Sequence, residues 1–220
     1  EFSENCINAQ EKINLSNQPK FFKTHHAYWK NGKYTFTNNL NSLGVIYIVR
    51  DPRNIITSIK NHYDFDDYNG ALDFLLNDKN VIGLRHSNNE MDLPHIISSW
   101  KNHYNSWKKM EKNYLLIKYE NLLENPLIEF KKITNYLEKL IDKKFEEKKI
   151  LESIDNCDFI KLKEQENELG FIEAQKDRFG EVKPFFNLGP SNDWNKLLGK
   201  NIARIIESEF YKEMSELNYL

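Results

Sequence analysis

The sequence predicts an α/β domain in which helices alternate with the strands of a parallel sheet. Residues 44–50 (GVIYIVR) and 114–120 (YLLIKYE) read as buried strands, because both are dominated by β-branched, aliphatic and aromatic side chains. Each of these runs leads directly into sequence with helical spacing, and strands that alternate with helices are typical of a parallel sheet. At 220 residues, the chain suits one domain over residues 1–220 with a single sizeable core.

Two proline signals predict where helices begin. Asp51 can cap a helix whose first position is Pro52, where the missing N–H costs nothing, and Asn125 with Pro126 repeats the signal. Further helices are expected over residues 69–78, 93–113 and 201–217 from their apolar spacing. A short buried strand is expected over residues 20–25 (KFFKTH), whereas residues 1–18 read as either a helix tail or a loop.

Composition excludes several classes of protein. The formal net charge is −2 with 40% hydrophobic and 29% charged residues, which predicts a folded globular protein with no nucleic-acid partner. Cys6 and Cys157 are far apart, which argues against a disulfide framework or a cysteine zinc site and fits a reducing compartment. The longest apolar run, residues 45–49, is too short to cross a bilayer. We expect a cytoplasmic protein, with an upstream targeting segment left open because the chain does not begin with methionine.

The segment RDPR at residues 50–53 is a candidate anion site. It places Arg50 and Arg53 at the carboxyl end of a predicted strand and beside a helix N-terminus, where phosphate groups bind favourably. For an isolated RDPR, however, a structural cap or a surface ion pair is the favoured explanation. Ser58 shares a helix face with Asn54, but spacing alone does not bring Ser58 to an anion.

The pair His25 and His26 raises the question of a metal. Adjacent residues in an extended segment point to opposite faces, and no HExxH spacing is present, so no metal site is predicted. Lys23 lies two positions before His25 on the same predicted face, and a cation beside a neutral imidazole suits a general base. A core or surface role for the histidine stays equally open. The spacing of Trp100, Tyr104 and Trp107 favours core residues.

Five segments, taken in order over about residues 20–200, resemble the sulfotransferase family, which uses 3′-phosphoadenosine-5′-phosphosulfate as donor. They are KTH (23–25), VIYIVRDPRNIITSIKNHYDF (45–65), SWKNHYNSW (99–107), LLIKYENLLENP (115–126) and FFNLGPSNDWNKLL (185–198). The resemblance implies a P-loop-like three-layer α/β domain with a central parallel sheet flanked by helices. No glycine precedes Gly32, so we expect the N-terminal strand and the 5′-phosphosulfate loop of the family to be missing.

The resemblance also implies roles for individual residues. His25 corresponds to the general base of sulfuryl transfer, and Lys23 to the cation that neutralises charge around the transferring group. Arg50 and Ser58 correspond to the ligands of the 3′-phosphate. The remaining nucleotide contacts implied are Tyr119, Phe159 and Gly189. From the residues alone, His103, Tyr28 and Phe22 are acceptor-side candidates, although the two aromatic residues could equally belong to the core. The donor is a cosubstrate that leaves as 3′-phosphoadenosine-5′-phosphate, and no metal is implied.

Departures from the family pattern leave alternatives open. Asn187 and Leu188 stand where the family has Arg-Lys, and Arg178 or Lys183 are candidates for the missing cation. Without the phosphosulfate loop, weak donor binding and little turnover are expected. Residues 196–209 lack the dimer motif of animal cytosolic members, so a monomer or a different dimer is expected. The acceptor is a small molecule or glycan with a hydroxyl or amine. A non-catalytic nucleotide- or partner-binding descendant stays open, whereas a kinase is disfavoured because no GxxxxGK[ST] loop is found.

Overall fold

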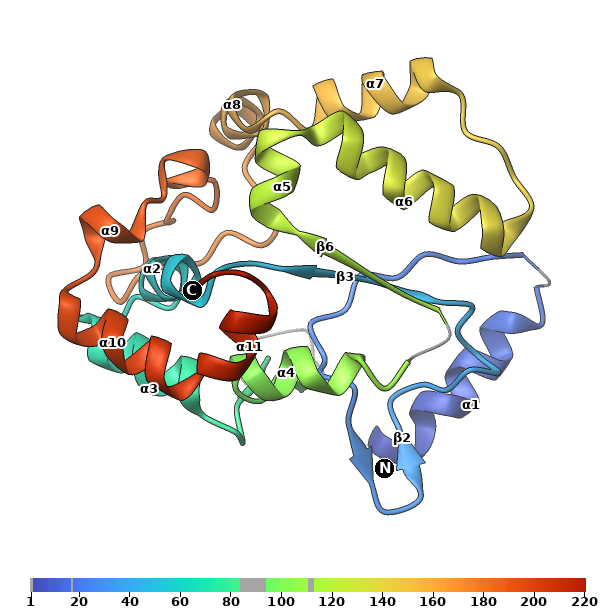
Figure 1. Ribbon diagram of the computed structural model, residues 1–220, viewed down its shortest axis with the longest axis horizontal. Coiled ribbons are helices and arrows are strands. Elements are labelled where there is room, and N and C mark those ends of the chain that lie inside the picture. Colours follow the sequence, from blue (N-terminus) through green and yellow to red (C-terminus); the bar gives the residue numbers. More distant parts are fainter. Residues whose placement is uncertain (1, 17, 84–93, 111–112) are drawn as a thin grey trace. The chain divides into compact units, whose positions relative to one another are not determined.

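The computed structural model describes residues 2–16, 18–83, 94–110 and 113–220 (Figure 1). The chain divides into two compact units. The first unit comprises Glu1–Val49, Leu76–Ile117 and Asn135–Lys143, and the second comprises Arg50–Leu75, Lys118–Thr134 and Lys144–Leu220. The expected single domain over residues 1–220 stays a prediction.

The first unit contains the parallel strand pair. Strands β3 and β6 are hydrogen-bonded neighbours that run in the same direction (Figure 1). Strand β1 pairs with β2, and β4 pairs with β5, in antiparallel fashion. The elements that begin in this unit are α1 (Phe2–Asn14), β1 (Lys30–Asn31), β2 (Tyr34–Thr35), β3 (Val45–Val49), β4 (Val81–Ile82), β5 (His95–Ile96), α4 (Trp100–Trp107) and β6 (Tyr114–Lys118).

The second unit is built from helices. Its elements are α2 (Pro52–His62), α3 (Tyr68–Leu76), α5 (Tyr119–Glu124), α6 (Pro126–Ile141), α7 (Glu147–Asn156), α8 (Phe159–Leu169), the 3₁₀ turn η1 (Gly189–Ser191), α9 (Trp194–Leu197), α10 (Lys200–Glu209) and α11 (Tyr211–Glu216). The last turns of α6 belong to the first unit.

The α/β class and the two strand–helix junctions are confirmed. Strand β3 ends at Val49, and α2 begins at Pro52 with the carboxylate of Asp51 accepting a hydrogen bond from the backbone N–H of Arg53 at 2.9 Å. Strand β6 likewise runs directly into α5. The expectation that residues 44–50 are buried throughout is wrong, because Ile48 in β3 is 55% exposed.

Three expected elements differ in the structure. Residues 20–25 form no strand, and their aromatic side chains, Phe21 and Phe22, point into solvent. The helix expected over 93–113 is limited to α4, because residues 95–96 form β5 and Ser98 adopts a left-handed φ of 59°; residues 93 and 111–112 lie outside the described part. The C-terminal helix is interrupted at the fully buried Phe210, where φ is −115° and ψ is 20°.

Each unit has its own buried apolar core. In the first unit, Trp100, Tyr104 and Trp107 turn one face of α4 inward, which confirms them as core residues, and the other buried side chains include Ala27, Trp29, Val49, Met110 and Ile117. In the second unit the buried side chains include Ile56, Ile59, Ala71, Leu72, Leu75, Ile150, Leu198, Ala203, Ile206, Phe210, Met214 and Leu217.

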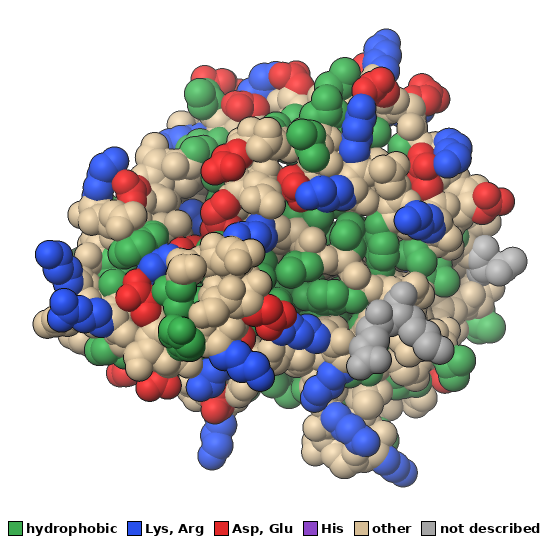
Figure 2. Space-filling model, in the orientation of Figure 1, with side chains coloured by type: hydrophobic (Ala, Val, Ile, Leu, Met, Phe, Trp, Pro, Cys, Tyr) green, Lys and Arg blue, Asp and Glu red, His purple; other side chains and the backbone are tan. Residues whose placement is uncertain are grey.

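The surface carries charges of both signs. On the face shown in Figure 2, Lys and Arg side chains lie mostly interspersed with Asp and Glu, in keeping with the formal net charge of −2. Among the described residues, no helix has the length and apolar character needed to cross a membrane.

Candidate nucleotide and histidine sites

Arg50 lies at the carboxyl end of β3 with part of its guanidinium unsatisfied. Its Cζ lies 4.3 Å from the ring centre of Tyr119, the first residue of α5. Its Nε is buried and has no hydrogen-bond partner among the described residues. A buried N–H without a partner is costly, and an anion placed beside it would remove that cost. The structure therefore brings Arg50 and Tyr119 together and leaves a donor available there.

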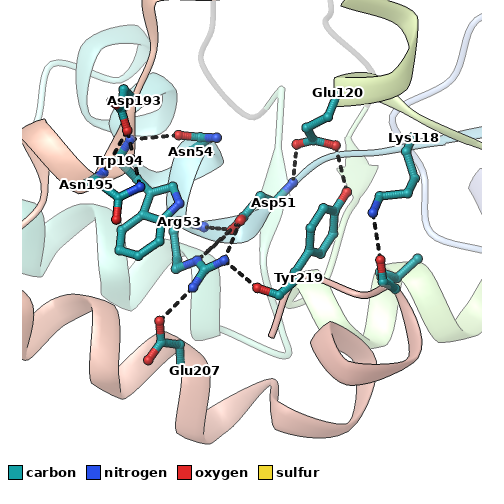
Figure 3. A network of polar contacts seen from close by, with 11 residues as sticks. Asp51, Arg53, Asn54, Lys118, Glu120, Asp193, Trp194, Asn195, Glu207 and Tyr219 are labelled. Atoms are coloured by element: carbon teal, nitrogen blue, oxygen red, sulfur yellow. Dashed lines mark hydrogen bonds and ion pairs between the residues drawn. The ribbon is translucent and has the colours of Figure 1, made fainter. Parts of the chain in front are cut away.

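Arg53, the second arginine of the motif, is fully engaged within the protein (Figure 3). It donates to both carboxylate oxygens of Asp51, to Glu207 at 2.7 Å and to the carbonyl of Tyr219 at 2.7 Å. The guanidinium also stacks on Trp194, with Cζ 4.0 Å from the ring centre. The structural explanation of RDPR thus applies to Asp51 and Arg53, and the anion-binding explanation remains for Arg50.

Gly189 and Phe159 are in direct contact. The φ of Gly189 is +51°, and a Cβ atom added there would lie 2.2 Å from Cε2 of Phe159. Both the left-handed conformation and the close approach require glycine at this position. Phe159 opens α8, where the carboxylate of Asp158 accepts hydrogen bonds from the N–H groups of Ile160 and Lys161.

Glu166 ties the segment before Gly189 to α8. Its buried carboxylate accepts hydrogen bonds from the backbone N–H of Phe185 at 2.6 Å and of Phe186 at 2.9 Å. The same helix therefore carries Phe159 and holds the approach to the Gly189 turn. The sequence offers no signal for this role, because Glu166 sits among other acidic residues in an ordinary helical stretch.

Asn192 connects α2 with the Gly189 turn. Its side chain bonds the carbonyl of Asn54 at 2.9 Å, the hydroxyl of Thr57 at 2.7 Å and Oγ of the exposed Ser58 at 3.4 Å. Its backbone N–H donates to the carbonyl of Gly189 at 3.2 Å. The structure thus brings Ser58 near Gly189 through Asn192, a residue that sequence reasoning missed.

Arg178 and Lys183, the expected replacement cations, are engaged with acidic side chains. Arg178 lies 3.2 Å from Asp64 and 2.5 Å from Asp66, and Lys183 lies 2.9 Å from Asp64. The hydrogen bonds from Lys183 and then from Arg178 hold the pKa of Asp64 below its ordinary value. Because their charges are used in these pairs, both cations act as anchors of the loop that contains them.

His25 and His103 are in contact in the first unit. The side chains of Phe22, Lys23 and His25 are exposed, and Nε2 of His103 lies 3.3 Å from the backbone carbonyl oxygen of His25. Tyr28 is half-buried, with its ring 5.5 Å from that of Trp107. The predicted site residues thus fall into two sets: the base and acceptor-side residues belong to the first unit, and the expected nucleotide residues belong to the second.

His26 is buried and structural. Its Nδ1 accepts hydrogen bonds from the backbone N–H of Ile96 at 3.1 Å and from the indole N–H of Trp29 at 3.4 Å, and its ring lies 4.7 Å from that of His95. Burial, followed by the neighbouring His95, lowers the pKa of His26 to about 4. No group of three or more potential metal ligands is found among the described residues.

The lowered pKa of His26 predicts acid destabilisation. The unfolded chain takes up the proton near the ordinary histidine pKa, whereas the folded chain takes it up only near 4. The contribution of neutral His26 to the free energy of unfolding is therefore fully present above about pH 6.5. This contribution falls by at most about 3 kcal/mol as the pH drops toward 4. Urea unfolding of the wild type and of His26→Asn, which keeps an acceptor but does not titrate, measures this. An equally steep pH dependence in both proteins would contradict the assignment.

The fold and these contacts define a class of protein: an α/β domain with an arginine donor left available at the carboxyl end of a strand. A family model described as the sulfotransferase domain matches residues 2–218. The chain belongs to the sulfotransferase family.

Known relatives are distant. The chain is 24% identical over 221 residues to mouse sulfotransferase 1 family member D1 and 25% identical over 223 residues to mouse sulfotransferase 1B1, matching 95% of this chain and 66% of each relative. Its fold is similar to mouse sulfotransferase SULT7A1 complexed with PAP (TM-score 0.64, 20% identity, 92% of this chain and 68% of that one). It is also similar to retinol dehydratase in complex with androsterone and inactive cofactor PAP (TM-score 0.57, 17% identity, 92% and 56%).

Proposed function

We propose that the protein is a sulfotransferase that moves a sulfuryl group from 3′-phosphoadenosine-5′-phosphosulfate to a hydroxyl or amine. The observation that carries the proposal is the buried Nε of Arg50 at the strand end, which has no partner in the described part of the chain, in a member of this family. In the reaction the acceptor atom bonds to sulfur, the bond from sulfur to the phosphate oxygen breaks, and 3′-phosphoadenosine-5′-phosphate departs. The acceptor proton passes to the protein.

The second unit has the residue types that this nucleotide needs. Arg50 and Ser58 offer a guanidinium and a hydroxyl to the 3′-phosphate, while Tyr119 and Phe159 offer aromatic faces to the adenine. Gly189 is the proposed backbone contact of the phosphate, and its missing side chain leaves the room that the Phe159 ring occupies. The PAP present in the two structural relatives supports the same ligand for this chain.

His25 is the proposed general base. Its imidazole is exposed, whereas that of the neighbouring His26 is buried and accepts two structural hydrogen bonds. Imidazole is the side chain whose ordinary proton equilibrium lies nearest neutrality, which suits removal of the acceptor proton. Lys23 would neutralise the negative charge of the transferring group. Phe22 and Tyr28 are the proposed acceptor-side residues, and a small molecule is the proposed acceptor, as androsterone is in the complex of one structural relative.

Titration of the protein with 3′-phosphoadenosine-5′-phosphate by calorimetry tests the nucleotide site. We expect Arg50→Ala to weaken binding by ~1.5–3 kcal/mol, because one charge-assisted contact is lost. Arg204→Ala is the matched control, since Arg204 is exposed on α10 and its loss removes the same charge.

No nucleotide binding by the folded wild type would refute the proposal, and equal affinity for wild type and Arg50→Ala would remove Arg50 from the site. Transfer of labelled sulfate to a panel of phenols, alcohols and amines then separates an enzyme from a nucleotide-binding descendant. Binding without any transfer would support the descendant.

A further inference from the structure

The segment that carries His25 receives its hydrogen bonds from one face of α4. His103 contacts the carbonyl of His25 at 3.3 Å, and the indole N–H of Trp107 donates to the carbonyl of His26 at 2.9 Å. The hydroxyl of Ser106 accepts from the backbone N–H of Tyr28 at 2.9 Å. Residues at spacings of three and four lie on one helix face, so α4 presents these three side chains to the segment together. The segment forms no strand, and these side chains satisfy its backbone instead.

His103 is itself held by Tyr47 of β3. The hydroxyl of Tyr47 lies 2.8 Å from Nδ1 of His103, and the two ring centres are 5.6 Å apart. The ring of Tyr47 packs 5.9 Å from that of Tyr104, which is fully buried. Tyr47 therefore has a fixed position from which its hydroxyl reaches His103.

The chemistry of the groups assigns the protons. A backbone carbonyl only accepts, so Nε2 of His103 carries the proton that it donates to His25. Burial lowers the pKa of His103 and raises the pKa of Tyr47, so the imidazole is neutral and the phenol is protonated. The Tyr47 hydroxyl therefore donates to Nδ1 of His103, and Nε2 of His103 donates to the His25 carbonyl. We call these two hydrogen bonds the relay.

We propose that Tyr47 and His103 are positioning residues, which fix the backbone of His25 and thereby aim its imidazole, instead of contacting the acceptor. This inference rests on the proposed function, in which His25 takes the acceptor proton. Both ring nitrogens of His103 are accounted for by Tyr47 and His25, so neither is left to bind an acceptor hydroxyl.

Paired substitutions test the relay. The side-chain nitrogen of glutamine reaches the place of Nε2, whereas asparagine reaches only the place of Nδ1. We expect His103→Gln to keep kcat within a few-fold, because an amide N–H donates to the His25 carbonyl without a tautomer that Tyr47 has to fix. His103→Asn, which does not reach that carbonyl, and Tyr47→Phe, which leaves the tautomer of His103 unfixed, should lower kcat about 10–100-fold with little change in the KM of the acceptor, because a misaimed base loses rate. Asn102→Ala is the control, since Asn102 lies on α4 but bonds Asp78.

A readout independent of turnover separates this inference from the proposed function. The ¹³C shift of the His25 carbonyl should change in His103→Asn and stay near wild type in His103→Gln. An unchanged shift in His103→Asn, with the variant folded, would overturn the relay. A changed shift with unchanged kcat, or a raised acceptor KM at full kcat in both His103 variants, would overturn the positioning role while the proposed function stands. A wild type that binds nucleotide but transfers no sulfuryl group would overturn the proposed function and the catalytic role of the relay together.

Discussion

His25→Gln is expected to lower kcat for sulfuryl transfer by about 10²–10⁴-fold, which is the usual contribution of a general base. Glutamine has a similar reach and keeps hydrogen-bonding capacity, but its amide does not accept a proton at neutral pH. His25 is not among the proposed nucleotide contacts, so the affinity for 3′-phosphoadenosine-5′-phosphate should not change. Single-turnover transfer and calorimetry measure the two quantities separately.

The control for this substitution is Lys20→Gln, an exposed residue of the same irregular segment that has no proposed role. Its kcat should equal that of the wild type. If His25→Gln transfers sulfuryl groups at the full rate, His25 is not the base. If kcat and the nucleotide affinity of this variant both fall, the substitution has disturbed the fold.

Arg53→Ala should lower the free energy of unfolding by about 3–5 kcal/mol, the range seen when one partner of a buried ion pair is removed. The substitution leaves the carboxylate of Asp51 buried without its bidentate partner. It also removes the bond to Glu207, the bond to the Tyr219 carbonyl and the stacking on Trp194 (Figure 3). Urea unfolding at neutral pH measures the loss.

Two further variants sharpen this test. Lys196→Ala breaks an exposed pair with Asp193 and should cost about 0–1 kcal/mol. Arg53→Met combined with Asp51→Asn should be less destabilising than Arg53→Met alone, because no unpaired buried charge remains. A loss below about 1 kcal/mol in Arg53→Ala would show that the network contributes little.

The sequence predicts β3 and the start of α2 correctly, because both depend on residues close together in the chain. The cap at Asp51, the proline at the start of α2 and the β-branched run of β3 are interactions between near neighbours in the chain, so the sequence displays them directly. The sequence alone does not show that Arg53 is held by partners within the protein while Arg50 keeps an available donor. The partners that occupy Arg53 include Glu207 and Tyr219, which follow it by 154 and 166 residues.

The misread strand at residues 20–25 has the same kind of cause. Its aromatic residues suggested burial, but the backbone just beyond it is satisfied by α4, and His103 follows His25 by 78 residues. Periodicity reports which face of a regular element is buried, and an irregular segment held by distant side chains has no period to report. The pairing of His103 with Tyr47, and the role of Glu166, are non-local for the same reason.

The contact between Gly189 and Phe159 limits how the proposed nucleotide site can be re-engineered. The space that a side chain at position 189 would need is already filled by the aromatic ring at position 159. Glu166 attaches the intervening backbone to the same helix. Helix α8 and the Gly189 turn should therefore be exchanged between homologues only together. A graft of one of them alone would combine a ring and a turn whose shapes do not fit each other.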